Sequence, residues 1–221
     1  MRCVRIWFDK IGDVKYISHL DLMRCFTRAM RRAKIPLWYT EGYNPRPYMQ
    51  FALPLSLGME SVCESVDIRV EGDIGNEEIL ENLKAVMPDG INIKSVTEPV
   101  HDPKKIAYGD FYLTFKGASD PERLEKLITD SLNGESFIVE KLGKKGRQKV
   151  MKEVDLKEHI KHSFVKRESD DVICNLVLPA GSSVNINPSL FSDKIAELYG
   201  ETLTVGILRK RLLLENMKEF K

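Results

Sequence analysis

The chain has 221 residues, 43% of them hydrophobic and 30% charged, and its 34 Lys and Arg against 33 Asp and Glu give a formal net charge of +1. Such a composition suits a globular protein with an apolar core, and the near-zero net charge excludes a uniformly basic nucleic-acid binder. No segment reaches the roughly 18–20 uncharged apolar residues that a membrane helix needs. Charges within the first ten residues argue against a signal peptide, so we expect a cytoplasmic protein without a membrane partner.

The first hundred residues alternate between strand and helix patterns. Alternating apolar residues indicate strands, and Ser18 stands where a helix N-cap is expected, with Asp21 three residues on. In chain order we predict a strand at 2–9, a helix from Ser18 to about Lys34, strands at 37–40 and 62–70, a helix at about 76–87 and a strand at 91–97.

The second half repeats this order of elements. Its residue pattern predicts strands at 110–116, 137–142, 172–180 and 202–215 and helices at 120–133 and 188–199. A basic insertion is expected at about 143–162. A βαββαβ unit packs two helices on one face of an antiparallel four-stranded sheet. We therefore predict an α+β protein of two tandem ferredoxin-like halves with antiparallel sheets. The domains would be 1–100 and 108–221, joined by a linker rich in proline and polar residues.

Residues 15–68 carry a distinctive set of motifs: HLDLMR, two adjacent arginines followed by a proline, GYNPRP and ALPLSLGMES. This stretch resembles the family described as radical-SAM-associated or radical-SAM-linked, whose members stand alone or are fused to a radical-SAM protein. The resemblance implies a radical-SAM protein as partner. The chain itself has no CxxxCxxC motif, so the partner would perform any radical chemistry.

The first helix carries four arginines at helical spacing. The first fifty residues hold ten Lys and Arg against four Asp and Glu, a local excess of six positive charges. Guanidinium groups on one helix face would bind phosphates or an acidic partner. The alternative is a solvated face, with cations favoured near the helix C-terminus. The candidate RNA- or phosphate-binding residues of this helix are Arg24, Arg28, Arg31 and Arg32.

The segment 41–47 predicts a rigid loop. Gly42 permits a positive φ, and the two prolines on either side of Arg46 fix the backbone there. Such a loop would present Tyr43 for stacking on a base and Asn44 and Arg46 for polar contacts with a phosphate. The alternative is a structural turn whose tyrosine packs inside.

A second basic segment, 143–149, supplies the candidates Lys144, Lys145 and Arg147. It lacks the glycine spacing and the terminal Lys-Ser/Thr of a phosphate-binding P-loop, so we expect it to follow a nucleic-acid backbone or to form a solvated hairpin tip. His159 and His162 would share a helix face, but no third ligand completes a metal site. The four cysteines are not at metal-ligand spacing, and we expect neither a metal nor another cofactor.

A more distant similarity connects the chain to CRISPR RNA-processing endoribonucleases, which use tandem ferredoxin-like domains and in some cases a histidine near the first helix. His19 is therefore a candidate general base, although a cap or a partly buried hydrogen-bonding group is the alternative. Our leading hypothesis is a non-catalytic module that binds tRNA or rRNA and works with a radical-SAM protein. The alternatives are a metal-independent endoribonuclease and a pure protein-interaction subunit.

Overall fold

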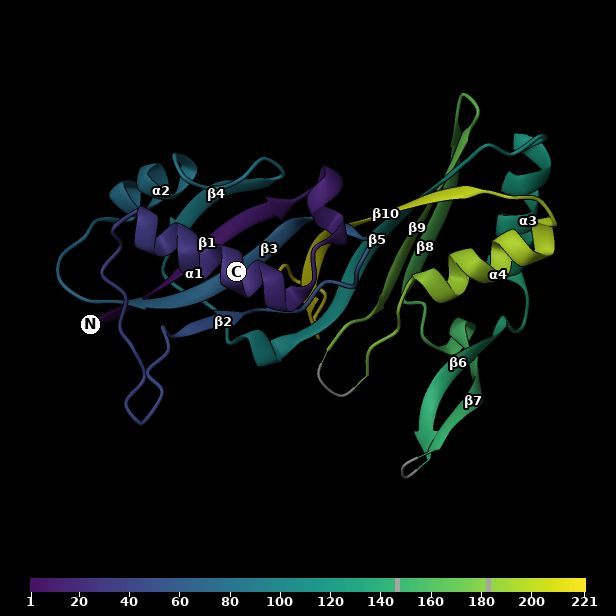
Figure 1. Cartoon of the computed structure of the whole chain (residues 1–221). Helices are drawn as coiled ribbons and strands as arrows, with labels where there is room; N and C mark the ends of the chain where they lie inside the picture. Colours follow the sequence, from purple (N-terminus) through teal and green to yellow (C-terminus); the bar gives the residue numbers. More distant parts are fainter. Residues whose placement is uncertain (146–147, 182–183) are drawn as a thin grey trace. The chain divides into compact units, whose positions relative to one another are not determined.

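The computed structural model describes residues 1–145, 148–181 and 184–221 (Figure 1). Across these residues the chain is an α+β protein with four α-helices and mostly antiparallel strands. It divides into two compact units, which we call unit 1, residues 1–106 with 214–221, and unit 2, residues 107–213. The return of residues 214–221 to unit 1 differs from the predicted domain ranges, which assigned them to the C-terminal half.

Unit 1 is built on an antiparallel sheet with the strand order β4–β1–β3–β2. The strands are β1 (Arg2–Lys10), β2 (Met49–Phe51), β3 (Glu60–Val70) and β4 (Ile91–Thr97). The register places Ile6 opposite Val66 and Arg5 opposite Asp67. Because successive side chains on a strand point to opposite faces, β1 and β3 present one apolar face and one polar face.

The helices α1 (His19–Arg32) and α2 (Asn76–Lys84) cover the apolar face. Helix α1 begins as predicted: the Ser18 Oγ accepts a hydrogen bond from the Asp21 N–H at 3.1 Å. Its buried residues Phe26 and Met30 join Val4 and Phe8 of β1 in one core. The predicted strand at 37–40 is reduced to isolated bridges at Leu37 and Tyr39. The partner of Tyr39 is Pro47, which has no N–H to extend the pairing.

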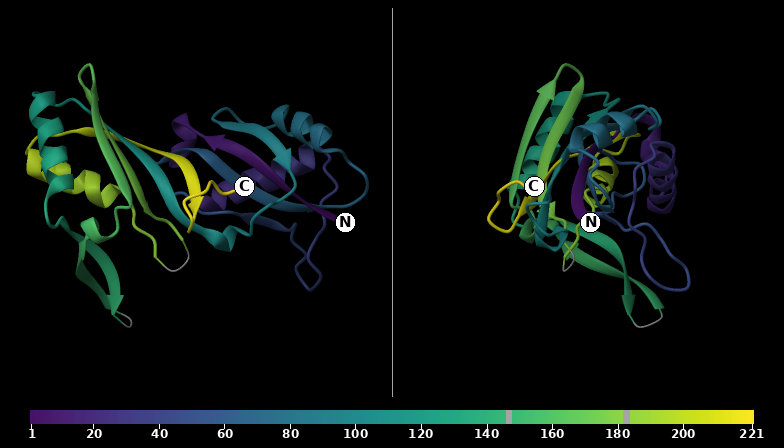
Figure 2. Two further views of the ribbon diagram at one scale, coloured as in Figure 1. Left: turned by 180° about the vertical axis from the view of Figure 1, so that it is seen from behind. Right: turned by 90° about the vertical axis from the view of Figure 1, so that its left-hand side faces the viewer.

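Residues 214–221 lie against the polar face of the unit 1 sheet. Phe220 is 2% exposed, and its ring centroid is 5.9 Å from that of Trp7 on β1. The N–H of His101 donates to the Lys221 carbonyl at 2.8 Å. Figure 2 shows this terminal segment beside the strands of unit 1. It covers part of a sheet face that the helices leave open.

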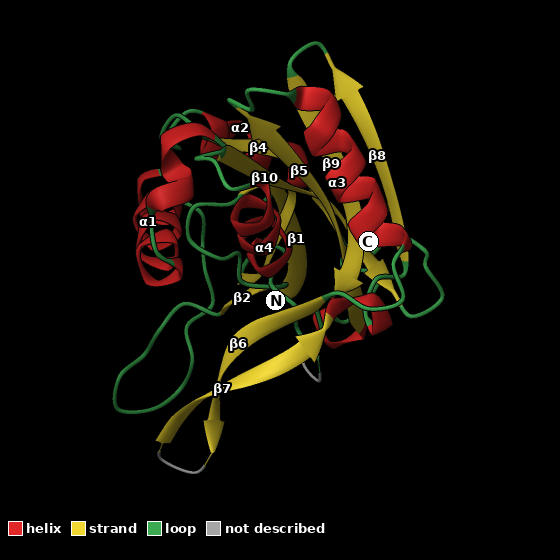
Figure 3. Cartoon of the chain, turned by 90° about the vertical axis from the view of Figure 1, so that its right-hand side faces the viewer, coloured by secondary structure: helices red, strands yellow, loops and turns green. Residues whose placement is uncertain are grey.

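Unit 2 has the strand order β10–β5–β9–β8, with its helices packed on one face (Figure 3). Its elements are β5 (Ile106–Lys116), α3 (Pro121–Asn133), β6 (Ile138–Lys145), β7 (Gln148–Asp155), β8 (His162–Glu168), β9 (Asp171–Pro179), α4 (Ser189–Tyr199) and β10 (Thr204–Leu214). Strands β6 and β7 form a separate two-stranded hairpin, so much of the predicted basic insertion is ordered strand.

The two histidines of unit 2 do not share a helix. His159 follows a short 3₁₀ helix, Leu156–Glu158, and His162 begins β8. The sequence interpretation that placed both on one helix face is therefore wrong. Within the described ranges no group of three or more His, Cys, Asp or Glu could hold a metal ion, and no helix is both long and apolar enough to cross a membrane.

Candidate functional site

The arginines of α1 line a hollow of about 710 Å³ in unit 1, which we call the α1 hollow. The helix brings them together because residues three and four positions apart lie on the same face. Four arginines and one aspartate of this helix therefore line the same hollow. The lining residues are Asp21, Arg24, Cys25, Arg28, Arg31, Arg32 and Pro88.

Two of these arginines are held by protein groups and two are not. Arg24 pairs with Asp21 at 3.1 Å, and Arg32 Nη2 donates to the Val86 carbonyl at 2.5 Å. Arg28 and Arg31 are exposed and have no polar partner in the part of the chain that the structure describes. Their guanidinium groups are therefore available to an anion.

The hollow contains one thiol, that of Cys25. Burial raises the pKa of this thiol, and the nearby Arg32 and Arg28 guanidinium groups partly offset the rise. The carboxyl of Asp21 has a lowered pKa, because it accepts hydrogen bonds from Ser18 and Arg24. Asp21 thus stays negative and neutralises only one of the four cations.

The loop 41–47 presents its side chains to solvent. Tyr43 is 100% exposed, so the alternative in which this tyrosine packs inside is wrong. Gly42 has a φ of 130°, and the Thr40 N–H donates to the Arg46 carbonyl at 2.8 Å to close the loop. Asn44 and Arg46 are exposed as well. None of these side chains lines the α1 hollow, and the loop between α1 and β2 projects away from the helix in Figures 1 and 3.

The second basic segment lies in unit 2. Lys144 and Lys145 are in β6, where their backbones pair with Lys149 and Gln148. Arg147 lies outside the described residues. Within unit 1, the structure therefore brings together the four arginines of α1, and the loop 41–47 does not line the hollow with them.

His19 stands at the first position of α1, half-buried, with its ring edge-on to Phe51 at 5.2 Å. Burial is the main cause of the lowered pKa of this imidazole. The Glu64 carboxylate raises the pKa and the Lys10 ammonium lowers it, and both effects are smaller than that of burial. A lowered pKa favours the neutral ring that a general base requires, but His19 does not line the α1 hollow.

Sequence reasoning missed the buried charges beside His19. Lys10 is 2% exposed and Glu64 is 4% exposed. Lys10 Nζ donates to the carbonyl of Ile17 at 3.2 Å. Each of these residues occupies a position at which the alternating pattern of its strand would place a buried apolar side chain. A charged residue at such a position is the sequence signal that would have identified them.

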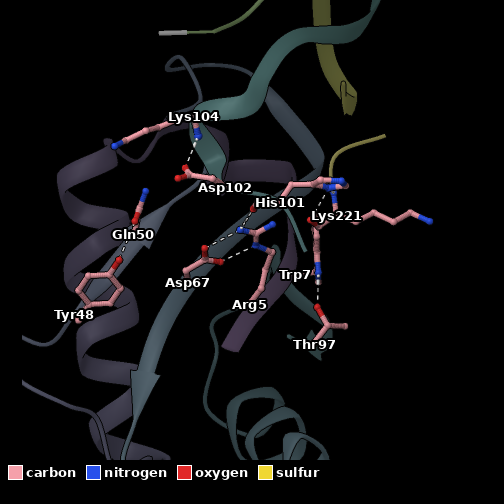
Figure 4. Close-up of polar contacts among 10 residues, drawn as sticks. All are labelled: Arg5, Trp7, Tyr48, Gln50, Asp67, Thr97, His101, Asp102, Lys104 and Lys221. Carbon is pink, nitrogen blue, oxygen red and sulfur yellow. Dashed lines mark hydrogen bonds and ion pairs between the residues drawn. The ribbon is translucent and has the colours of Figure 1, made fainter. Parts of the chain in front are cut away.

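The polar face of the unit 1 sheet was also missed. Arg5 is 0% exposed and donates to both carboxylate oxygens of Asp67, through Nε at 2.6 Å and Nη2 at 2.7 Å (Figure 4). Nη2 also donates to the His101 carbonyl at 2.8 Å. The remaining nitrogen, Nη1, has no hydrogen-bond partner among the described residues, but the guanidinium carbon lies 4.4 Å from the Phe220 ring centroid. A bidentate, ring-covered ion pair of this kind fixes the carboxylate in one orientation.

A pocket of about 350 Å³ lies beside this ion pair, and we call it the sheet-face pocket. Strands β1, β2 and β3 each contribute one residue to it, and the segment 99–103, which includes the polar residues His101 and Asp102, forms the rest of the wall. The lining residues are Cys3, Gln50, Asp67, Pro99, Val100, His101, Asp102 and Pro103.

Comparison with solved structures supports the α+β fold. A chain from a structure titled "Crystal Structure of a Cbf5-Nop10-Gar1 Complex" is 10% identical with a TM-score of 0.53, over 95% of this chain and 48% of that chain. This protein thus spans about half the length of that chain. A structure titled "Crystal Structure of an Unknown Protein from Galdieria sulphuraria" is 9% identical with a TM-score of 0.27, over 93% and 96% of the two chains, which is too low to support an argument. No curated protein matches the sequence.

A family model matches residues 3–188, a range that extends from β1 to the end of β9 and holds the α1 hollow, while α4 and β10 lie beyond it. Its description is "Uncharacterized protein conserved in bacteria (DUF2344)". With so much of its length matched, the chain belongs to this family of uncharacterized proteins conserved in bacteria.

Proposed function

We propose that the protein is a non-catalytic RNA-binding module that recognises tRNA or rRNA and works in the cytoplasm with a radical-SAM protein. The observation that carries the RNA-binding part is the α1 hollow, where four guanidinium groups face one carboxylate. A guanidinium offers a planar set of donors that matches a phosphate, and neutralised phosphates release counterions. Arg28 and Arg31, which have no protein partner among the described residues, are the strongest candidates.

Two other features support the radical-SAM partner and the fold subtype. The motifs of residues 15–68 support a radical-SAM partner, because they resemble the radical-SAM-linked family. The strand orders β4–β1–β3–β2 and β10–β5–β9–β8 support two ferredoxin-like halves, since each four-stranded sheet has its first and third strands, counted along the chain, in the centre. RNA bound at the α1 hollow would then be presented to the partner for its chemistry.

The test is the binding of a transfer RNA by the full chain, measured by fluorescence anisotropy at a series of salt concentrations. We expect the Arg28→Ala/Arg31→Ala double variant to bind more weakly. The slope of log affinity against log salt should fall by about 1.4–1.8, because each lost phosphate contact removes roughly 0.7–0.9. The matched control, Lys210→Ala/Lys218→Ala, removes two exposed cations that do not line the hollow and should leave the slope unchanged.

Two outcomes would overturn the proposal. If the wild type binds no RNA, either alone or with its radical-SAM partner, the protein-interaction subunit becomes the better hypothesis. If the RNA is cleaved and His19→Ala abolishes cleavage, the protein is an endoribonuclease with His19 as its base. In the second case the lowered pKa of the His19 imidazole would suit its role as the base.

A further inference from the structure

A groove of about 710 Å³ lies in unit 2 between the β6–β7 hairpin and helix α4, and we call it the hairpin groove. Figures 1 and 3 show β6 beside α4. The helix contributes one stripe of side chains, Leu190, Asp193, Lys194 and Glu197, because residues three and four positions apart share a helix face. No residue of the α1 hollow lines this groove, so the two sites are separate.

The hairpin turns one of its two faces toward the groove. Ile138 and Glu140 are two positions apart on β6, and Met151 and Glu153 are two positions apart on β7. Because alternate residues of a strand share a face and Glu140 is paired with Glu153, all four side chains lie on the same side of the hairpin. Val139 points to the other side and joins the core of unit 2.

Apolar side chains are exposed along this groove. Ile138 is 44% exposed and Met151 is 56% exposed, although both are large and apolar. Leu190 of α4 is half-buried and lines the same space. Exposed apolar side chains that gather in a concave surface are typical of a site that another molecule covers, and the flexible methionine side chain adapts to such a partner.

The groove is strongly acidic. It is lined by four carboxylates and one ammonium group, a formal charge of −3. The ammonium group, that of Lys194, is paired with Glu197 of its own helix at 3.0 Å. Burial raises the pKa of the Asp193 carboxyl, which shows that the groove partly screens this group from water. Partly dehydrated carboxylates favour a cationic partner.

Glu140 and Glu153 stand directly opposite each other across the hairpin. Like charges in such a position destabilise a strand pair. On the other face Lys141 is likewise opposite Lys152, but Lys141 Nζ donates to the Asn185 carbonyl at 2.9 Å. Neither glutamate has a hydrogen bond or an ion pair among the described residues. A cation from outside the chain would relieve the repulsion that the fold leaves between them.

The nature of the cation follows from the rest of the groove. Across the residues that the structure describes, no group of three carboxylates could hold a metal ion. A polyamine would satisfy the charge but would leave Ile138 and Met151 exposed. A phosphate backbone would be repelled by the carboxylates. A polypeptide segment that carries both lysine or arginine and apolar side chains matches the charge and the exposed apolar surface together.

We propose that the hairpin groove docks a cationic segment of a partner protein, whose lysine or arginine side chains pair with Glu140 and Glu153 while its apolar side chains cover Ile138 and Met151. The inference goes beyond the proposed function, because this surface requires neither RNA nor the arginines of α1.

Fluorescence anisotropy of labelled synthetic peptides with the full chain tests the groove. Two probes contain only leucine and lysine, one with leucine at helical spacing and one with leucine at every second position. A third probe replaces each leucine by serine, and a fourth replaces each lysine by glutamate. At least one leucine–lysine peptide should bind about tenfold more tightly than the serine–lysine peptide, which lacks the apolar contacts. The leucine–glutamate peptide should not bind.

Two results with these probes would overturn the proposal. The first is that neither leucine–lysine peptide binds. The second is that the serine–lysine peptide binds as tightly as the leucine–lysine peptides, since the groove would then attract positive charge without docking a segment.

The Glu140→Gln/Glu153→Gln double variant removes the opposed charges with little change of shape. It should weaken binding of the leucine–lysine peptide about threefold or more at low salt, and the difference should shrink as the salt concentration rises. The thermal midpoint, followed by circular dichroism, should equal or exceed that of the wild type, because a repulsion is removed. Unchanged affinity, or weaker binding together with a lower midpoint, would contradict the docking role.

Matched variants separate the groove from the general charge of the protein. Glu98→Gln/Glu219→Gln makes the same charge change at two exposed positions of unit 1 and should leave the peptide affinity unchanged. Equal weakening in this control would assign the binding to net charge and overturn the proposal. Met151→Ser should weaken the leucine–lysine peptide severalfold without changing the affinity for the serine–lysine peptide.

The Arg28→Ala/Arg31→Ala variant should bind the leucine–lysine peptides as the wild type does. The result is therefore independent of the RNA-binding test, and a failure of one proposal leaves the other standing. Loss of peptide binding in this variant would place the peptide at the α1 hollow and contradict the assignment to the hairpin groove.

Discussion

Arg5 and Asp67 form a single buried ion pair that contributes to the stability of unit 1. Their atoms are in contact although the residues are 62 positions apart in the chain. Removal of one partner leaves the other charge buried without compensation, which is more destabilising than the loss of an exposed pair.

We therefore expect Arg5→Met to lower the free energy of unfolding of unit 1 by about 3–5 kcal/mol. The matched control is Arg24→Met, which breaks an exposed pair with Asp21 and should change stability by less than about 1 kcal/mol. Urea unfolding followed by tryptophan fluorescence reports on unit 1, because Trp7 and Trp38, the two tryptophans of the chain, both lie there. Equal midpoints for the two variants would contradict the structural role of the pair.

His19 gives a pH dependence whose sign follows from its surroundings. Burial lowers the pKa of the folded imidazole below its ordinary value of 6.5. Just below pH 6.5 the unfolded chain therefore binds more protons than the folded chain. The contribution of His19 to the free energy of unfolding is therefore fully present above pH 6.5. It declines as the pH falls from 6.5 toward the lowered pKa.

In His19→Gln this component of the decline should disappear, because glutamine does not titrate. The measurement is the thermal midpoint between pH 5 and pH 8 for the wild type and the variant. Parallel curves for the two proteins would show that His19 carries no such linkage.

At the scale of elements, the turn between α2 and β4 depends on one glycine. Gly90 has a φ of 85°, and a Cβ there would lie 2.5 Å from the Ile11 carbonyl oxygen and 2.8 Å from Val14 Cγ2. The Ile11 N–H also donates to the Gly90 carbonyl at 2.9 Å, so the two loops are joined at this point.

Gly90→Ala should therefore destabilise unit 1 by at least about 1–3 kcal/mol, from backbone strain together with the clash. Gly206→Ala is the control, since a Cβ at Gly206 would meet no atom within 4 Å. Chemical unfolding of both variants checks the difference. A neutral Gly90→Ala would mean that the turn can move away from Ile11.

The elements that could be predicted are those with local determinants. Helix α1 can be predicted because its cap, its apolar face and its arginine spacing all lie within fifteen residues of one another, and the same helix geometry predicts that its four arginines project from one side. The sheet-face pocket could not be predicted, because it depends on the register of β1, β2 and β3. A single sequence gives the strands but not which residues face each other across them.

At the scale of the whole molecule, unit 1 is assembled from two separate parts of the chain. Phe220 packs against the ring of Trp7 and the Arg5 guanidinium, although 213 positions separate residues 7 and 220. No local pattern could have shown that residues 214–221 close the polar face of a sheet formed by the first hundred residues.

Phe220→Ala should lower the free energy of unfolding of unit 1 by about 3–5 kcal/mol, the usual result of removing a buried aromatic ring. Glu219→Ala, at an exposed neighbouring position, should be close to neutral. Tryptophan fluorescence during urea unfolding distinguishes them. If Phe220→Ala unfolds at the wild-type midpoint, the terminal segment does not contribute to the stability of unit 1.

The discontinuity of unit 1 also sets the order in which a ribosome can complete the two units. Unit 2 consists of residues 107–213 without interruption, so every residue that it needs has been synthesised before residue 214. Unit 1 begins first but lacks Phe220 until later, and Arg5 stays without its ring cover during that interval. Because domains fold as units when their residues are available, co-translational folding should finish in the reverse of chain order, with the N-terminal unit last.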